Sequence, residues 1–120
     1  MTTLTTLFKN QAGGTTLVAG EKVFSAGEPA EHLFVVQQGR IDIRVGRAVV
    51  ESVEPGGIFG EMAMIDGSTR SADAVAAEDS VVLPIGNQQF DFLITETPHF
   101  ARLVMKVLVE RLRSANSSCT

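Results

Sequence analysis

The sequence is poor in several features that mark large classes of protein. It has one cysteine, Cys119, so an internal disulfide framework is excluded and a reducing compartment is expected. It has no run of 18 apolar residues, so a transmembrane helix is not expected. Its first ten residues lack the basic-then-apolar layout of a secretory signal. Together these absences predict a cytoplasmic protein.

Positive charge and histidine are scarce as well. The chain has ten lysines and arginines and 14 acidic residues, which gives a net charge of −4. It therefore offers no basic stripe that could bind a nucleic-acid backbone. We therefore expect no direct nucleic-acid partner, and an anionic ligand would have to meet a local charge. The only histidines, His32 and His99, are far apart in sequence. Because metal sites of cupin-type barrels use clustered histidines, we expect no metal site.

Glycine is the residue that organises most of the chain. Eleven glycines, mostly before residue 90, separate short apolar or alternating segments. The clearest is 41–45, where apolar and polar residues alternate as in a strand with one buried face. Gly46-Arg47 then separates it from a second segment, which predicts a hairpin. Such spacing is typical of an antiparallel barrel or sandwich. The expected strands are 15–18, 22–24, 33–37, 41–45, 48–53, 71–76 and 81–85.

The pattern becomes helical after residue 86. Asn87 can cap a short helix over 88–95, and Thr97-Pro98 is a start signal for a second helix over about 98–114. Apolar residues of the second helix cover an arc of about 240°, wider than the stripe of a one-sided surface helix. We therefore expect this face to meet either the rest of the domain or a partner, which would be a second copy or a separate effector.

These patterns predict a single α+β, mainly β, domain over residues 1–120. Its antiparallel β-roll would cover about residues 14–86, and its C-terminal helices would cover about 87–114. Leu4, Leu7 and Phe8 suggest a further small helix near the N-terminus.

Candidate ligand-binding chemistry lies in the segment 55–76, which reads PGGIFGEMAMIDGSTRSADAVA. Gly60 has no side chain, so a ligand can approach its backbone, and 61–65 has the character of a single helical turn. Glu61 can accept a hydrogen bond from a hydroxyl, whereas Arg70 offers a planar fork to phosphate oxygens and Ser71 adds a donor. The segment therefore predicts a ligand with a sugar hydroxyl next to a phosphate.

Gly60-Glu61-Met62-Ala63 followed by Arg70-Ser71-Ala72 resembles the phosphate-binding cassette of cyclic nucleotide-binding domains. This is the family of the catabolite activator protein and of the regulatory subunit of cAMP-dependent kinase. Gly20-Glu21, Gly27-Glu28, 33–36 and Pro55-Gly56-Gly57 also match, so the resemblance covers roughly residues 14–113. It implies a jelly-roll-like β-roll (a double-stranded β-helix) with a short cassette helix.

The resemblance also implies a role for each cassette residue. Glu61 would accept from the ribose 2′-hydroxyl, Arg70 would pair with the exocyclic phosphate oxygens, and Gly60 and Ser71 would contact ribose and phosphate closely. The residues expected to offer backbone N–H groups are Met62, Ala63 and Ala72. The residues expected to wall the pocket are Val35, Ile58 and Phe59.

The expected function is reversible binding of a cyclic nucleotide by a sensor or regulatory module, without catalysis. In the family, threonine after the arginine tends to accompany cGMP and a small residue cAMP. Ser71 lies between them, and we favour cAMP over cGMP. In relatives the last helix moves on nucleotide binding, so this helix would carry the signal to a partner.

Two alternatives stay open: a ligand-free interaction module that keeps the scaffold, and a cupin-type metal-dependent barrel enzyme. A separate alternative for Glu61 and Arg70 is an ordinary surface ion pair near a turn.

Overall fold

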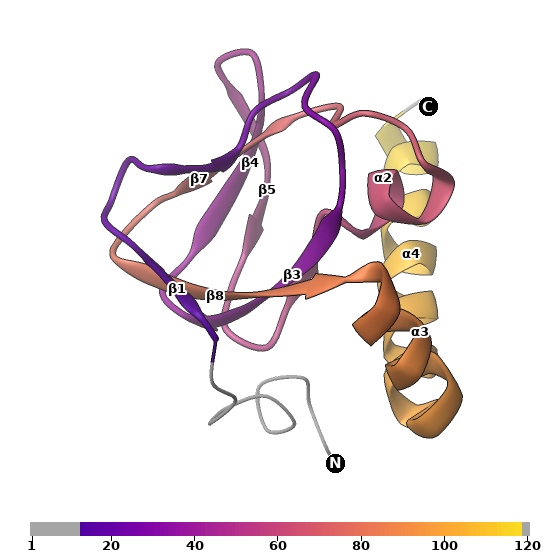
Figure 1. The fold of residues 1–120 in the computed structure, drawn as a ribbon. Coiled ribbons are helices and arrows are strands. Elements are labelled where there is room, and N and C mark those ends of the chain that lie inside the picture. Colours follow the sequence, from indigo (N-terminus) through magenta and orange to yellow (C-terminus); the bar gives the residue numbers. More distant parts are fainter. Residues whose placement is uncertain (1–12, 119–120) are drawn as a thin grey trace. The chain divides into compact units, whose positions relative to one another are not determined.

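Two four-stranded antiparallel sheets organise the first part of the computed structural model, which describes residues 13–118 (Figure 1). A short helix interrupts the strands and two helices follow them, as the sequence predicts. The chain divides after Asn87 into two compact units, here called the β-roll unit and the helical unit. The elements of the β-roll unit are β1 (Thr15–Leu17), β2 (Lys22–Phe24), β3 (His32–Gln38), β4 (Ile41–Val45), β5 (Ala48–Val53), β6 (Ile58–Phe59), α2 (Glu61–Asp66), β7 (Asp73–Ala76) and β8 (Ser80–Gly86).

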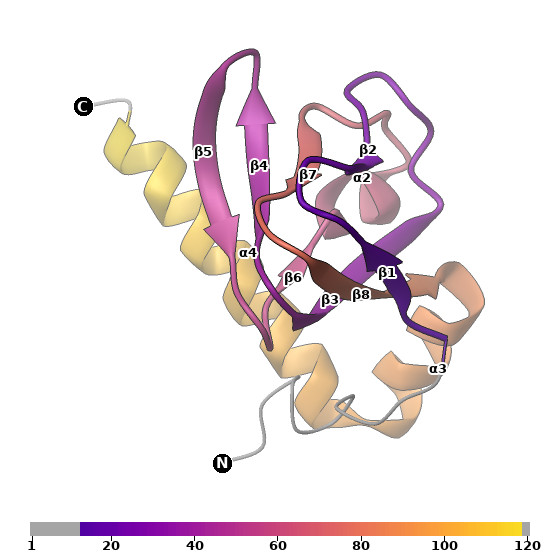
Figure 2. The ribbon, with the colours of Figure 1, turned by 90° about the vertical axis from the view of Figure 1, so that its left-hand side faces the viewer.

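The strands pair in an order that brings distant segments together. One sheet has the order β1-β8-β3-β6 and the other β2-β7-β4-β5, with antiparallel pairing throughout (Figure 2). The predicted hairpin is confirmed, because β4 pairs with β5 and the turn passes through Gly46 at a φ of 62°. As a result β2, near the start of the roll, lies beside β7, which directly follows the cassette.

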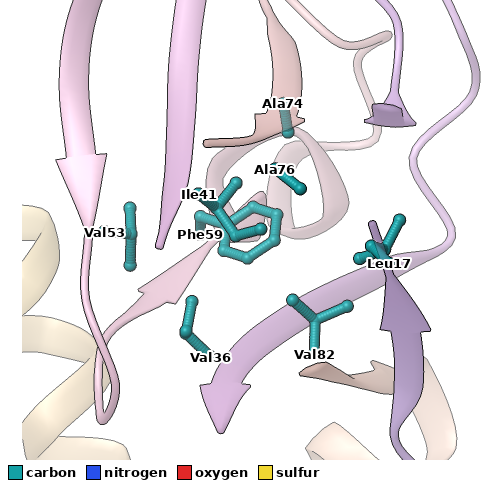
Figure 3. Packing of buried hydrophobic residues seen from close by; sticks show 8 residues of the cluster. All are labelled: Leu17, Val36, Ile41, Val53, Phe59, Ala74, Ala76 and Val82. Atoms are coloured by element: carbon teal, nitrogen blue, oxygen red, sulfur yellow. The ribbon is translucent and has the colours of Figure 1, made fainter. Parts of the chain in front are cut away.

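The core of the β-roll unit is formed by alternate residues of both sheets. Each sheet contributes four side chains to one cluster, and Phe59 lies among its neighbours in Figure 3. Each large apolar side chain that is buried in this way stabilises the fold by roughly 1.5–3 kcal/mol. The cluster consists of Leu17, Val36, Phe59 and Val82 from the first sheet, and Ile41, Val53, Ala74 and Ala76 from the second.

Two strands differ most from the sequence-based expectation, whereas β1, β3 and β8 differ from it by a single residue at one or both ends. Ile58–Phe59 is expected as part of the pocket wall and not as a strand, but it pairs with β3 as β6. Conversely, β7 begins at Asp73 and not at residue 71. The reason is local, since Arg70 makes its backbone hydrogen bonds with Gly27 and Glu28 and not with a neighbouring strand. The chain joins the ladder only after it leaves that turn.

The helical unit contains α4 (Pro98–Ser118) and all of α3 (Asn87–Glu96) except its first residue. The predicted break at Thr97-Pro98 is confirmed, and the Thr97 carbonyl accepts a hydrogen bond from the Phe100 N–H at 2.9 Å. Within this unit the ring of Phe90 meets the ring of Phe100 edge-on, with centroids 6.0 Å apart. α4 ends at Ser118, beyond the expected end at residue 114. None of the described helices has the length and apolar composition needed to cross a membrane. The helix expected around Leu4–Phe8 lies outside the described residues.

Candidate functional site

A six-residue helix between two glycines opens the candidate site. Gly60 precedes α2 with a φ of 79° and Gly67 follows it with a φ of 75°, so both ends use the left-handed conformation that glycine adopts at low cost. The predicted short helix over 61–65 is confirmed, and it extends by one residue to Asp66. After Gly67, only residues 68–69 separate the helix from Arg70.

The Arg70 side chain reaches back across this segment. It is only 5% exposed, and its Nη1 donates a hydrogen bond to the carbonyl oxygen of Gly60 at 2.6 Å. Its Nη2 donates to the carbonyl oxygen of His32, the first residue of β3. Its Nε is buried and has no hydrogen-bond partner among the described residues. A buried guanidinium thus joins the start of α2 to β3 and keeps unused donor capacity.

Three phenylalanines, here called the phenylalanine cluster (Phe24, Phe34 and Phe59), contact one another, and two of them lie next to the guanidinium. Arg70 Cζ is 4.0 Å from the centroid of the Phe24 ring and 5.9 Å from that of Phe34. Phe34 and Phe59 are stacked at 5.2 Å, and Phe24 is 6.0 Å from each of them. The cluster therefore connects the cation to the interior of the roll.

The backbone of Arg70 is fixed by the turn between β2 and β3. The N–H of Gly27 donates to the Arg70 carbonyl at 2.8 Å, and the N–H of Arg70 donates to the Glu28 carbonyl at 2.9 Å. Burial lowers the pKa of Arg70, and the Glu28 carboxylate raises it. Because the usual pKa of arginine lies far above neutral pH, the group stays cationic. The site therefore holds a permanent positive charge in a fixed place.

Glu61 is the first residue of α2 and directly follows the glycine that Arg70 binds. Its side chain is 1% exposed. A carboxylate in such surroundings has a high desolvation cost, which hydrogen bonds to it can offset. The structure thus places a buried carboxyl group one residue from the Gly60 carbonyl that the buried Arg70 cation contacts.

The remaining predicted residues fall into two groups. In the cassette, Met62 and Ser71 are exposed, whereas Ala63 and Ala72 are half-buried. The predicted pocket walls are all buried, but they do not share one face. Val35 and Ile58 pair with each other, one position along from the pair of Phe34 and Phe59. Since neighbouring residues of a strand point to opposite faces, only Phe59 of the three predicted walls faces the interior cluster.

Sequence reasoning did not find Phe24, Phe34, Glu28 or the carbonyl of His32 as parts of this site. Each contacts or faces Arg70 only because β2, β3 and the turn between them fold against the cassette. A short strand ending in an aromatic residue carries no local signal of such a contact. Among the described residues, no three histidine, cysteine, aspartate or glutamate side chains are grouped as a metal site requires.

Comparison with known proteins gives a consistent result. The model of the family described as "Cyclic nucleotide-binding domain" matches residues 15–97. The chain is 33% identical over 103 residues to a cyclic nucleotide-gated potassium channel of Mesorhizobium japonicum, a match that covers 86% of this chain and 28% of the channel. It resembles the crystal structure of the catabolite activator protein of Thermus thermophilus with a TM-score of 0.80 and 27% identity, over 93% of this chain and 60% of that one.

A second similar structure is associated with a cyclic-GMP-dependent signalling pathway in bacterial phytopathogenesis. Its TM-score is 0.79 with 27% identity, and the match covers 94% of this chain and 95% of that chain. The chain spans less than two thirds of the channel and of the catabolite activator protein. Since the family model covers most of the residues and the cassette geometry accompanies it, the chain belongs to the cyclic nucleotide-binding domain family.

Proposed function

We propose that this domain binds a cyclic nucleotide reversibly, with cAMP favoured over cGMP, and that it acts by binding and not by catalysis. The observation that carries the proposal is the buried Arg70 guanidinium, whose Nε has no partner among the described residues. An unsatisfied donor on a buried cation costs free energy, and an oxyanion would relieve that cost.

Phosphate suits this group for geometric reasons. Two of the five guanidinium N–H groups donate to carbonyl oxygens of Gly60 and His32, and these bonds hold the planar fork in one orientation. Phosphate oxygens accept such donors in pairs, and charge-assisted hydrogen bonds are about twice as strong as neutral ones. We propose that Arg70 binds the exocyclic oxygens of the cyclic phosphate, while backbone N–H groups of Met62, Ala63 and Ala72 face the same group.

We assign the ribose to Gly60 and Glu61, the first two residues of the cassette. Glu61 is buried and ionisable, so it can accept a hydrogen bond from the 2′-hydroxyl. Gly60 would allow the sugar to approach its backbone, because it has no side chain. The preference for cAMP rests on Ser71, which follows the arginine where a threonine would favour cGMP. The names of the relatives include both a catabolite activator protein and a cyclic-GMP-dependent pathway, which is why both nucleotides belong in the test.

Calorimetric titration with cAMP, cGMP and linear AMP tests the proposal. We expect saturable binding of cAMP, weaker binding of cGMP and little binding of AMP. Arg70→Ala should remove most of the affinity, and cAMP recovered after long incubation should be unchanged. If neither cyclic nucleotide binds at millimolar concentration, the proposal is wrong and the ligand-free interaction module becomes the better explanation. Hydrolysis of cAMP by the pure protein would contradict the non-catalytic part.

We further propose that α4 carries the output, through a contact with a second copy or a separate effector. Met105, Val109 and Leu112 are 59%, 45% and 62% exposed and recur at helical spacing. Sedimentation of the domain with and without cAMP separates the two partners. A dimer that Val109→Glu dissociates would support the second copy, and a monomer under all conditions would favour the effector. The cytoplasmic location remains a prediction from the sequence.

A further inference from the structure

Phe24 contacts the functional group of a residue far away in the sequence. Its ring centroid lies 4.0 Å from Cζ of Arg70, well inside the range of about 6 Å at which a cation is attracted to an aromatic face. Phe24 closes the three-residue strand β2 and is half-buried, and it lies 6.0 Å from Phe34 and from Phe59. One side of the guanidinium therefore meets a ring and not water.

The ring and two carbonyl oxygens together leave the guanidinium little freedom. The carbonyls of Gly60 and His32 accept from the two Nη atoms, which fixes directions within the guanidinium plane. Phe24 bounds the group on one face, which limits its tilt. Gly60 makes this contact possible, since a Cβ there would lie 2.8 Å from Nη1 of Arg70 and 3.2 Å from Cε2 of Phe24.

We propose that Phe24 is a positioning residue for anion recognition, which acts by holding the Arg70 guanidinium through its aromatic face. The inference rests on the proposed function, because it explains how the phosphate-binding group is held ready. A ring that desolvates one face also strengthens the hydrogen bonds that the cation makes at its edge. A leucine at position 24 would remain apolar but would lose the electrostatic attraction of the ring.

A fluorination series at position 24 separates electrostatics from shape. Replacement of Phe24 by mono-, di- and trifluorophenylalanine withdraws electron density from the ring face with little change in size. We expect the dissociation constant for cAMP to rise stepwise along the series. The same series at Phe34, which lies 5.9 Å from Arg70 Cζ and belongs to the same cluster, should have a much smaller effect. Equal affinity across the Phe24 series would overturn the inference.

Ordinary variants give an independent test. Phe24→Leu should weaken cAMP binding by about 3- to 30-fold, the range of cation–π contributions, while Phe24→Tyr should keep near-wild-type affinity. In an Arg70→Lys background, which lacks the planar fork, the loss caused by Phe24→Leu should shrink. A loss of the same size in both backgrounds would mean that Phe24 acts only as core packing.

The outcomes also separate this inference from the proposed function. If the wild-type protein does not bind cAMP or cGMP, the proposed function fails and the inference fails with it. If wild-type protein binds cAMP, Arg70→Ala does not, and Phe24→Leu binds as well as wild type, only the inference fails. Should Phe24→Leu not fold, the isosteric fluorinated series still decides. A ring-current shift of the Arg70 Nε–H resonance, lost in Phe24→Leu and kept in Phe24→Tyr, would support the contact without any ligand.

Discussion

The carbonyl oxygen of Gly60 accepts a hydrogen bond from Nη1 of Arg70 at 2.6 Å. The glycine that begins the cassette is therefore joined directly to the arginine near its end, and α2 lies in the loop between them. A change at either residue should alter both the fold of this loop and the place where an anion would bind.

The first prediction compares alanine at the two glycines that bracket α2. Gly60 and Gly67 both have a positive φ, so Gly67→Ala should cost about 1–2 kcal/mol of stability from backbone strain alone, since nothing lies within 4 Å of its new Cβ. Gly60→Ala carries the same strain and also crowds Arg70 Nη1 at 2.8 Å. Urea denaturation should show both losses, but calorimetry should show weaker cAMP binding mainly for Gly60→Ala. Equal binding losses would contradict a specific role for Gly60.

The second prediction replaces Arg70 by lysine. Lysine keeps a positive charge but has no planar fork, so it cannot reach both carbonyl oxygens and a phosphate at once. We expect Arg70→Lys to weaken cAMP binding by roughly 10- to 100-fold, the value of one charge-assisted hydrogen bond. Titration calorimetry at two salt concentrations measures this loss of cAMP affinity. Affinity within about twofold of wild type would show that only net charge matters at this position.

The third prediction concerns Glu61 and the ribose. If its carboxylate accepts the 2′-hydroxyl, 2′-deoxy-cAMP should bind the wild-type protein at least about tenfold more weakly than cAMP. Glu61→Gln keeps the size of the side chain and removes its charge, so it should reduce this discrimination. Parallel titrations of both ligands against both proteins form a complete cycle. Discrimination that is unchanged by Glu61→Gln would assign the hydroxyl to another group.

Much of this fold could be predicted from local patterns, and the reasons are physical. Ile41–Val45 alternates clearly and a glycine turn separates it from the largely apolar segment Ala48–Val53, so the bounds of both strands are predicted correctly. Ile58–Phe59 is too short to show a period, which is why β6 was not predicted. The break at Thr97-Pro98 is set by proline, whereas no residue near 114 stops α4, and it continues to Ser118.

The candidate site shows the same division. Glu61 and Arg70 carry the chemistry in their side chains, and a specific motif surrounds them, so the sequence could single them out. The environment that gives Arg70 its orientation comes from Phe24 and His32, which are distant in the chain. Contacts of this kind depend on the pairing of β2 with β7 and of β3 with its neighbours, and a single sequence contains no signal for that register.

The last prediction concerns Asp73, the first residue of β7, and the pH dependence of stability. Hydrogen bonds from the backbone N–H of Ala26 and from Lys22 lower the pKa of Asp73 below its usual value, and Lys22 Nζ lies 3.3 Å from its Oδ2. A carboxyl group with a lowered folded-state pKa contributes stability above its unfolded-state pKa of about 4, and this contribution disappears as pH falls through the folded-state value.

Asp73→Asn should therefore destabilise the protein at neutral pH and much less at about pH 2–3. Lys22→Gln removes the lysine charge but leaves the hydrogen bond from the Ala26 N–H in place, so it should leave part of this dependence in place. Urea midpoints of the three proteins across this pH range provide the measurement. A penalty for Asp73→Asn that is the same at both ends of the range would mean that the carboxylate charge of Asp73 does not stabilise the junction between β2 and β7.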